Sequence, residues 1–389
     1  MVEWKKLGDI CEIIRGNGVQ KTDFVESGVG CIHYGQIYTH YGSFTYTTNK
    51  YVSKEVFDKA RKASKGDIIM TDTSENVEDI CKSVAYLGEE DIAVSNHALI
   101  LKHKQNPKFL TYSTLTNSFS NQKRKFVFGA KVSGIKPENL AQIKIYLPSL
   151  SEQNRIVGIL DTFTASIDNL KEQIAQRRKQ YEYYRDQLLD LEGKEGVEMK
   201  YLLDVLAQPV TDGPHETPSF YEDGIPFISA DAIVDNKINF SRKRGYISEE
   251  YDLLCQKKYK PQLNDIYLVK SGSTTGKVAI VRTDERFNIW SPLAAIRVNQ
   301  RNHPYFVYYM LQTKKVQDQV KLKSSQGSQP NLSMRVLEKF IIPVPPLSEQ
   351  QRVVSILDTF EASILNLEAQ LSQREKQYEY YRNKLLTFE

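Results

Sequence analysis

The sequence predicts an α+β protein in which two tandem α/β domains are each followed by a long helix, the two helices forming an antiparallel coiled coil with pseudo-twofold symmetry. Segments of the first half recur in the second half in the same order. Each long helix carries a heptad pattern, and the regions before the helices contain short β-branched stretches bounded by turn residues. These three observations indicate the order domain, helix, domain, helix.

The internal repeat is strongest in the helices. Residues 150–153 (LSEQ) recur as 347–350, residues 160–163 (LDTF) as 357–360, and residues 179–185 (KQYEYYR) as 376–382. Weaker similarities join the regions before the helices: residues 4–10 resemble 199–205, 65–68 resemble 263–266, and 106–109 resemble 303–306.

We therefore divide the chain into domains at 1–149 and 196–346, with helices at 150–195 and 347–389. The helices have stayed alike while the domains have diverged. This difference indicates that the helices perform one task twice and that the domains perform two different tasks.

The apolar positions of each helix alternate between spacings of four and three residues, which is a heptad seam. In the first helix they are Ile156, Leu160, Phe163, Ile167, Leu170, Ile174, Tyr181, Tyr184, Leu188 and Leu191. In the second they are Val353, Leu357, Phe360, Ile364, Leu367, Leu371, Tyr378, Tyr381, Leu385 and Phe388. A helix of this length spans about 60 Å, which is too long for burial in one small domain, so we expect the two helices to pack on each other.

Signals at the helix ends follow the usual pattern. Each helix comes after a proline-containing stop, and Ser151 and Ser348 are the predicted N-caps. Gly193 and Gly196 are predicted to close the first helix.

Two arginines, Arg177 and Arg374, interrupt the two seams at the same place. They pair with nearby glutamates of their own helix or contact a partner, and both interpretations stay open. Exposed tyrosines such as Tyr183 and Tyr380 offer a further surface to partner subunits.

The regions before the helices contain strand-like and helix-like segments. Strands are predicted at 67–71, 92–95, 99–102, 266–270, 278–282 and 295–298. Helices are predicted at 109–118 and 305–313.

The composition is that of a globular protein, with 40% hydrophobic and 26% charged residues in 389. No stretch of about 18 apolar residues occurs, and the first residues lack the apolar core of a signal peptide, so we expect a soluble cytoplasmic protein. The four cysteines form no metal-binding or disulfide pattern. A net charge of +4 fits a polyanionic partner but is also common in proteins that bind none.

The polar loops have the composition of nucleic-acid contacts, because amides, hydroxyls and imidazoles bond base edges while lysines suit phosphates. In the first domain the predicted DNA contacts are Lys21, His33, Tyr34, Gln36, Tyr38, Thr71, Thr73, Ser74, Asn76, Asn96, His97 and Lys131. In the second they are His215, Thr217, Ser229, Asp231, Lys270, Ser271, Ser273, Thr274, Thr275, Lys277, Gln329 and Asn331. An ordinary solvated turn is the alternative for any one of these loops.

The sequence contains no recognisable catalytic constellation. Residues 272–277 (GSTTGK) resemble a phosphate-binding loop, but one residue is missing between the glycines and Val278 replaces the magnesium-binding Ser or Thr. We therefore predict a protein that is not an enzyme and that has no metal or cofactor of its own.

These features together resemble the specificity subunits of Type I restriction-modification enzymes. The resemblance rests on the duplicated helix opening with LSEQ and on residues 27–41 (SGVGCIHYGQIYTHY) and 211–230 (TDGPHETPSFYEDGIPFISA). It implies two target-recognition domains, each reading half of an interrupted double-stranded DNA site, with the helices setting the gap.

The resemblance also implies partners. Two methyltransferase subunits, and two motor-nuclease restriction subunits in the full enzyme, would supply the chemistry that uses S-adenosylmethionine, ATP and magnesium. The alternatives are a stand-alone DNA-binding regulator that dimerises through its coiled coil, which would copurify without methyltransferase chains, and an enzyme, which would show metal-dependent turnover.

Overall fold

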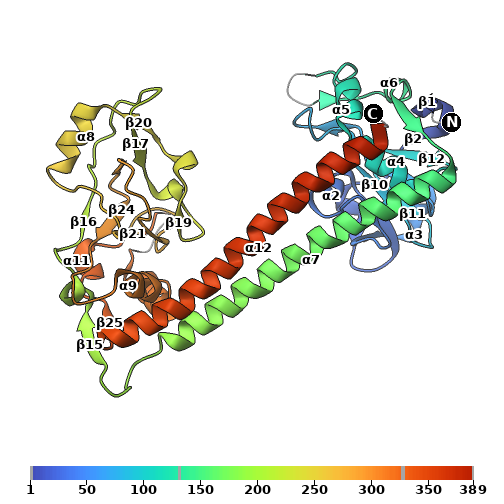
Figure 1. Cartoon of the computed structure of the whole chain (residues 1–389). Helices are drawn as coiled ribbons and strands as arrows, with labels where there is room; N and C mark the ends of the chain where they lie inside the picture. Colours follow the sequence, from blue (N-terminus) through green and yellow to red (C-terminus); the bar gives the residue numbers. More distant parts are fainter. Residues whose placement is uncertain (1–2, 130–132, 326–328, 388–389) are drawn as a thin grey trace. The chain divides into compact units, whose positions relative to one another are not determined.

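The computed structural model describes residues 3–129, 133–325 and 329–387. The chain folds into two compact units: unit 1 comprises Met1–Glu172 and Ala369–Glu389, and unit 2 comprises Gln173–Glu368. The long helices α7 (Leu150–Leu188) and α12 (Leu347–Thr387) each contribute a segment to both units (Figure 1). The rest of each unit is called its head.

Head 1 is built on two five-stranded sheets. One has the order β2 (Cys11–Arg15), β12 (Ala98–His103), β8 (Ile68–Thr71), β10 (Ser83–Tyr86) and β5 (Phe44–Thr45). The other has the order β3 (Phe24–Val25), β6 (Lys50–Val52), β4 (Val29–Ile32), β11 (Ile92–Val94) and β7 (Arg61–Ala63). Two short pairs complete the strands: β1 (Glu3–Lys6) with β14 (Lys144–Leu147), and β9 (Thr73–Ser74) with β13 (Ser133–Gly134).

Short helices connect these strands. They are α1 (Leu7–Ile10), α2 (Tyr34–Thr39), α3 (Lys54–Lys59), α4 (Pro107–Thr114), α5 (Asn117–Lys123), α6 (Pro137–Leu140) and the 3₁₀ turn η1 (Lys21–Asp23). Side-chain caps start several of them: the Asn106 carboxamide accepts from the amide of Phe109 at 3.1 Å, and the Thr116 hydroxyl accepts from the amide of Phe119 at 3.2 Å.

Head 2 repeats this plan with fewer strands. Its main sheet has the order β16 (Thr211–Asp212), β24 (Leu293–Ile296), β21 (Ile266–Val269) and β22 (Val278–Ile280). A second sheet has the order β20 (Gly245–Ile247), β17 (Ile225–Ile228) and β23 (Asn288–Ile289), and two pairs join β15 (Glu198–Tyr201) with β25 (Ile341–Val344) and β18 (Ile233–Val234) with β19 (Lys237–Ile238).

The helices of head 2 follow the same order along the chain. They are α8 (Glu249–Gln256), α9 (Pro304–Leu311), α10 (Lys314–Lys323) and α11 (Met334–Leu337), with the 3₁₀ turns η2 (Leu202–Val205), η3 (Ala230–Ala232) and η4 (Phe240–Arg242). Among the described residues, no helix is both long enough and apolar enough to cross a lipid bilayer.

Each head holds the first turns of the long helix that follows it. Gln153 of α7 is fully buried; its Oε1 accepts from the amide of Asn106 at 3.0 Å, and its Nε2 donates to the carbonyl of Pro148 at 2.9 Å. In unit 2, Gln350 makes the matching bonds to the amide of His303 at 2.8 Å and the carbonyl of Pro345 at 2.9 Å. The repeated glutamine of LSEQ therefore anchors each helix to its own head.

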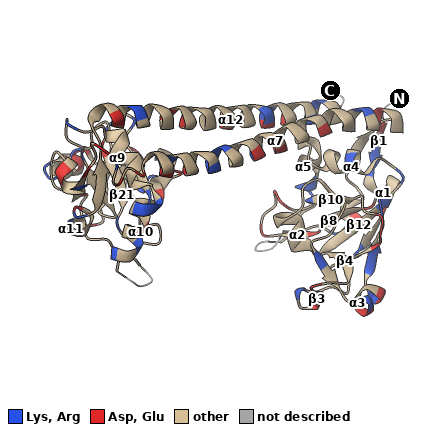
Figure 2. Cartoon of the chain, turned by 90° about the horizontal axis from the view of Figure 1, so that it is seen from below, with Lys and Arg blue, Asp and Glu red and all other residues tan. Residues whose placement is uncertain are grey.

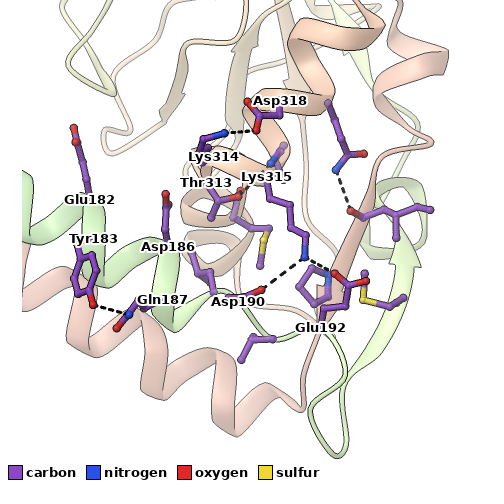
Figure 3. Close-up of a pocket in the computed structure, with 18 of the residues that line it drawn as sticks. Glu182, Tyr183, Asp186, Gln187, Asp190, Glu192, Thr313, Lys314, Lys315 and Asp318 are labelled. Carbon is purple, nitrogen blue, oxygen red and sulfur yellow. Dashed lines mark hydrogen bonds and ion pairs between the residues drawn. The ribbon is translucent and has the colours of Figure 1, made fainter.

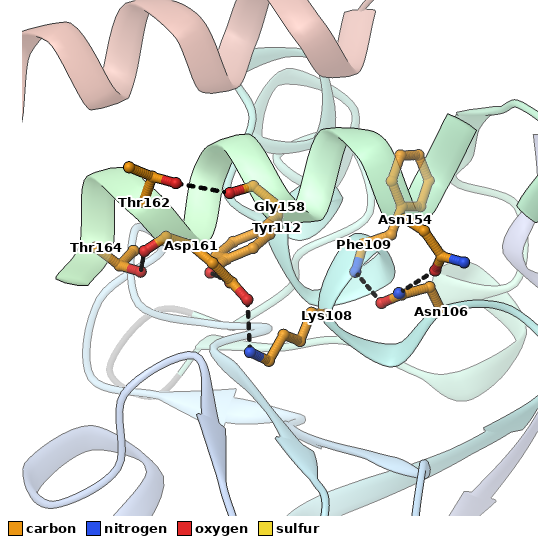
Figure 4. Close-up of polar contacts among 9 residues, drawn as sticks. All are labelled: Asn106, Lys108, Phe109, Tyr112, Asn154, Gly158, Asp161, Thr162 and Thr164. Carbon is orange, nitrogen blue, oxygen red and sulfur yellow. Dashed lines mark hydrogen bonds and ion pairs between the residues drawn. The ribbon is translucent and has the colours of Figure 1, made fainter. Parts of the chain in front are cut away.

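The aspartate of the LDTF repeat makes a second anchor (Figure 4). Asp161 accepts a hydrogen bond from the Tyr112 hydroxyl at 2.6 Å and an ion pair from Lys108 Nζ at 2.7 Å. Asp358 accepts the equivalent bond from the Tyr309 hydroxyl at 2.6 Å. Burial is the main cause that raises the pKa of Tyr112, and Asp161 adds to it, so the phenol stays a donor.

The two long helices run antiparallel in both units, as predicted. In unit 1, Phe163 of α7 stacks on Tyr381 of α12, with ring centroids 5.5 Å apart. In unit 2, Tyr184 of α7 stacks on Phe360 of α12, also at 5.5 Å, and Arg178 pairs with Glu368 at 2.7 Å. Charged residues of both signs lie along both helices (Figure 2).

The seam residues divide into two groups. Ile156, Leu160, Val353 and Leu357 are fully buried in the cores of their own heads, whereas Phe163, Tyr184, Phe360 and Tyr381 pack helix against helix. Tyr181 and Leu191 are buried in the core of unit 2, and Leu191 follows the end of α7. Phe388, the last predicted seam position, lies outside the described residues.

Arg374 interrupts the seam of α12, and Tyr183 and Tyr380 lie beside the seams. Arg374 donates to Gln377 Oε1 of its own helix at 3.1 Å and lies 5.7 Å from the centre of the Phe163 ring of α7. Tyr183 and Tyr380 are 59% and 58% exposed, as predicted.

Several predicted helix ends are wrong. Helix α7 begins at Leu150, and the hydroxyl that accepts from the amide of Glu152, at 3.4 Å, belongs to Ser149, so Ser151 lies in the first turn. Ser348 likewise lies inside α12. Helix α7 ends at Leu188, before Gly193 and Gly196, which take positive φ of 76° and 74° in the loop that follows.

The predicted helix at 109–118 is two helices, α4 and α5. The Thr116 side chain caps a new helix where one continuous helix was expected.

We predict that Gln153→Ala lowers the free energy of unfolding by about 2–4 kcal/mol, because it leaves a partly buried amide and a buried carbonyl without partners. Chemical denaturation measures the change. Its neighbour Glu152, in an exposed pair with Arg155, is the matched control, and Glu152→Ala should cost about 0.5 kcal/mol or less. Equal losses in the two variants would contradict the anchoring role of Gln153.

Candidate nucleic-acid interface

A buried carboxylate organises the candidate surface of head 1. Asp72 directly follows β8, and its Oδ2 lies 2.5 Å from Nη2 of Arg15 at the end of β2. Nδ1 of His97 lies 3.8 Å from the other carboxylate oxygen. The Asp72 side chain is fully buried, whereas those of Arg15 and His97 are 58% and 57% exposed. Two basic side chains therefore reach solvent beside one buried negative charge.

The turn between β11 and β12 is held in a strained conformation. His97 has a φ of 64°, which is unusual for a residue with a Cβ. Its carbonyl accepts from the amide of Asp72 at 3.2 Å, and the side chain of Asn96 accepts from the amide of Gly18 at 3.1 Å. These bonds fix two of the predicted DNA contacts, Asn96 and His97, next to Arg15.

His33 and Tyr34 extend this cluster. His33 is buried at the N-terminus of α2, where its Nδ1 accepts from the amide two residues on at 3.2 Å. The ring of Tyr34 lies 4.5 Å from the His33 ring and 5.4 Å from the His97 ring, measured between centroids. The structure thus brings His97 to His33 and Tyr34, which lie more than 60 residues earlier in the sequence.

Head 2 has a corresponding cluster around Asp212, at the end of β16. Its buried carboxylate contacts Lys258, Nε2 of His215 at 3.2 Å and Nζ of Lys270 at 3.3 Å. The side chains of His215 and Lys258 are 71% and 49% exposed. Here too, basic side chains project from a buried negative charge.

Two predicted loops of head 2 lie against each other. Ser271 and Asn331 form a β-bridge, and the amide of Gly272 donates to the carbonyl of Pro330 at 3.0 Å. Within residues 270–277, the amides of positions 275, 276 and 277 all donate to carbonyls of the same hairpin. Since these amides are occupied, the segment is a closed turn between β21 and β22 and not a phosphate-binding loop.

The remaining predicted contacts fall into three groups. Thr71 is fully buried in β8 and Ser229 is 5% exposed, so both lie in the core and not in exposed loops, where they were predicted. Exposed or half-buried positions are Lys21, Gln36, Tyr38, Thr73, Ser74, Asn76, Thr217, Asp231, Ser273, Thr274, Thr275, Lys277 and Gln329. Lys131 lies outside the described residues.

Sequence reasoning did not list Arg15, Asp72 or Asp212 among the predicted DNA contacts, although the two aspartates lie in loops with the composition of such contacts. The available signal was an aspartate directly after the apolar run of β8, since such a residue is buried only with a partner. Their partners could not be found from spacing, because Arg15 and Asp72 meet only across the sheet.

A second kind of surface is a groove that occurs in both units. In unit 2 it has a volume of about 1030 Å³ and lies between the β15–β25 pair, α10 and the end of α7 (Figure 3). Met199, Ile341 and Val316 give it an apolar lining, and Lys315 at its rim pairs with Glu192 and, at 3.7 Å, with Asp190.

The groove of unit 1 has a volume of about 670 Å³ and lies between β1–β14, α5 and the end of α12. In the sequence repeat, Trp4 of this groove is equivalent to Met199 of the other groove, and Lys144 is equivalent to Ile341. The two grooves therefore occupy the same place in the two copies but differ in composition.

Comparison with known proteins identifies the family. Residues 1–177 and 213–375 match the Type I restriction modification DNA specificity domain. The chain belongs to this family. A Type I restriction enzyme specificity subunit of Escherichia coli is 35% identical over an alignment that covers 64% of this chain and 64% of that protein. A putative Type I specificity subunit of Haemophilus influenzae is 31% identical, with 76% of each chain covered.

Solved structures of the same family share the fold. The S subunit of a Type I restriction-modification system from M. genitalium has a TM-score of 0.55 at 15% identity, covering 99% of this chain and 96% of that one. A chain from a structure on complex assembly and conformational transition of the type I R-M system has a TM-score of 0.63 at 16% identity, covering 99% and 97%.

The family assignment confirms the predicted fold class and the predicted resemblance to Type I specificity subunits. The relatives are named as specificity subunits of restriction enzymes, in agreement with a chain that is not itself the enzyme. Their names give no support to the alternative of a stand-alone DNA-binding regulator.

The buried His33 predicts a pH dependence. Burial is the main cause that lowers its pKa from the usual 6.5, and Lys21 and His97 add to the effect. Below about pH 6.5 the unfolded chain therefore binds a proton that the folded chain does not, and stability falls as the pH falls. Thermal unfolding should show a smaller loss between about pH 7.5 and 5.5 for His33→Gln than for the wild type. The exposed His40 supplies the control, since His40→Gln should keep the wild-type loss; an unchanged loss in His33→Gln would refute the prediction.

Proposed function

We propose that each head of this specificity subunit reads one half of a two-part double-stranded DNA site, while the paired long helices set the distance between the halves. The recognition domains are residues 1–149 and 196–346, and residues 150–195 and 347–389 form the spacer. The basic clusters around Asp72 and Asp212 are the proposed DNA-facing surfaces.

One observation carries this proposal: the glutamine and aspartate bonds that attach head to helix recur in both copies, whereas the heads differ in their loops. Gln153 and Gln350 make the same two kinds of bond, and Asp161 and Asp358 each accept a bond from a tyrosine hydroxyl. Rigid attachment matters for a reader of two half-sites, because a half-site of a few base pairs is too frequent to be specific, and coupling multiplies the two selectivities.

The proposal includes partners. Two methyltransferase subunits would each use one of the two grooves, and two restriction subunits would join in the full complex. Those subunits would supply the chemistry that uses S-adenosylmethionine, ATP and magnesium. The grooves support this arrangement because they recur at equivalent positions with exposed apolar side chains, Trp4 at 44%, Met199 at 45% and Ile341 at 48%.

The direct test is to express the chain with its methyltransferase and to map the methylated positions in the DNA of the cell. The expected result is a site of two defined segments separated by a fixed number of unspecified base pairs. Methylation without such a site would overturn the proposal.

Lengthening the helices should change the spacing alone. One heptad inserted into α7 between Ile167 and Tyr181, with one inserted into α12 between Ile364 and Tyr378, adds about 10 Å of helix. We expect the gap in the DNA site to grow by about three base pairs, with both half-sequences unchanged. Selection of methylated sites from a random library measures this.

The matched control for that experiment places the same seven residues in the loop after Gly193, where both helices stay intact. This variant should keep the wild-type gap. An unchanged gap in the variant with longer helices, or an equal change in the loop variant, would refute the spacer role.

A charge in the groove of unit 2 should remove one partner. Ile341→Lys places an ammonium among the apolar side chains of the lining, and we expect the number of methyltransferase chains per specificity chain to fall from two to one. Native mass spectrometry of the copurified complex measures this number. Leu322→Lys, at a position 82% exposed outside the groove lining, is the control and should keep two. Two partners on the Ile341→Lys variant would exclude this groove as the docking site.

A further inference from the structure

The main sheets of the two heads carry a charged pair at the same place, with the charges exchanged. In head 1, Leu99 of β12 lies between Arg15 on β2 and Met70 on β8. In head 2, Ala294 of β24 lies between Asp212 on β16 and Leu268 on β21. The repeat aligns residues 65–68 with 263–266, and therefore Met70 with Leu268.

It follows that Arg15 corresponds to Asp212, and Asp72 corresponds to Lys270. In head 1 the arginine is on the edge strand and the carboxylate follows the central strand, with 2.5 Å between them. In head 2 the carboxylate is on the edge strand and the lysine follows the central strand, at 3.3 Å. The pair has been kept while its polarity has been reversed.

The reversed polarity leaves the stability of the sheet satisfied but changes the side chains at the surface. A buried carboxylate is stable only with a cation beside it, so either polarity satisfies the sheet. What changes with polarity is the set of side chains that the carboxylate holds at the surface: Arg15 and His97 in head 1, Lys258 and His215 in head 2. The exchange therefore alters the chemistry offered to a ligand without altering the fold.

The held groups are suited to DNA. A guanidinium has five N–H donors, and one carboxylate oxygen engages few of them, so Arg15 keeps donors for base edges or phosphates. Fixing a long side chain before binding reduces the rotamer entropy lost when DNA arrives. In addition, Oδ1 of Asp72 is buried without a hydrogen-bond donor among the described residues, and His97 is the basic group near it.

We propose that Asp72 and Asp212 are positioning residues for DNA sequence recognition. Each holds the basic side chains of its own head in the geometry in which they meet one half-site, and the reversed polarity makes the two heads present different donors. This inference rests on the proposed function, since it assigns the half-site preference to these two pairs.

The test uses the full chain, coexpressed with its methyltransferase, and selection of methylated sites from a random DNA library. Asp72→Asn keeps the size of the side chain and removes its charge. We expect base preference to weaken in one half-site, with binding of that site about ten- to hundredfold weaker, while the other half-site stays unchanged. Asp212→Asn should do the same to the opposite half-site. Glu89→Gln, in an exposed pair with Lys65, is the control and should change neither.

A second variant separates positioning from stability. Arg15→Asp combined with Asp72→Lys gives head 1 the polarity of head 2, and we expect thermal stability near that of the wild type without the wild-type preference at that half-site. Recovery of the wild-type preference, or a uniform weakening of both half-sites by Asp72→Asn, would mean a structural role only and would overturn the inference.

The wild type distinguishes this inference from the proposed function. A wild-type chain that selects no two-part site overturns both. A wild-type two-part site that Asp72→Asn and Asp212→Asn leave unchanged overturns the inference alone.

Discussion

The architecture depends on the burial of the first turns of each long helix in the head that precedes it. Gln153 and Gln350 satisfy backbone groups that would otherwise be buried without partners, at a cost of about 1–3 kcal/mol each. Asp161 and Asp358 add a tyrosine hydroxyl bond about two turns further along each helix. These bonds need particular side chains at particular places, which explains why the helix starts have stayed alike. The ion pair at each helix start differs between the copies: Lys108 pairs with Asp161 in unit 1, whereas Arg282 pairs with Glu361 in unit 2.

The heads obey a looser constraint. In their main sheets, β2, β12 and β8 of head 1 correspond to β16, β24 and β21 of head 2. The side chains of these strands can differ between the heads, because burial requires apolar side chains but not particular ones. The loops at the strand ends do not need apolar side chains, but any charge that they bury needs a partner of opposite charge. Head 1 meets this requirement with Arg15 and Asp72, and head 2 meets it with Asp212 and Lys270. Substitutions therefore cost little stability in the loops where recognition is proposed, and more stability where the helices are attached.

The sequence predicted the features that repeat or have a period, and it missed those that depend on contacts across the sheet. Both long helices follow from the heptads, since a spacing of four and three leaves a continuous apolar face. Their antiparallel pairing follows from the connectivity, because the first helix must return the chain to a second domain. The N-cap at Ser149 was missed because Ser149 and Ser151 are equally suited by type, and only backbone geometry selects one. Thr71 was predicted at a surface because it ends a strand beside polar residues, yet it pairs with Ala98 of β12 within the sheet and is fully buried. No local pattern links Arg15 to Asp72.

The core of unit 1 includes side chains from the last turns of α12, so unit 1 folds completely only with the end of α12 in place. Leu386 of α12 is 4% exposed in the core of unit 1, and Asn383 Oδ1 accepts from the amide of Asn117 at 2.8 Å. Unit 1 therefore cannot complete its core until residues beyond 369 are available, although head 1 is made first. Contacts of such sequence separation slow folding, because the loop between them must close before they stabilise anything. A head exchanged between relatives must accordingly fit both helices, the one that follows it and the one that returns to it, and this double fit is a physical reason for the helices to stay alike while the heads vary.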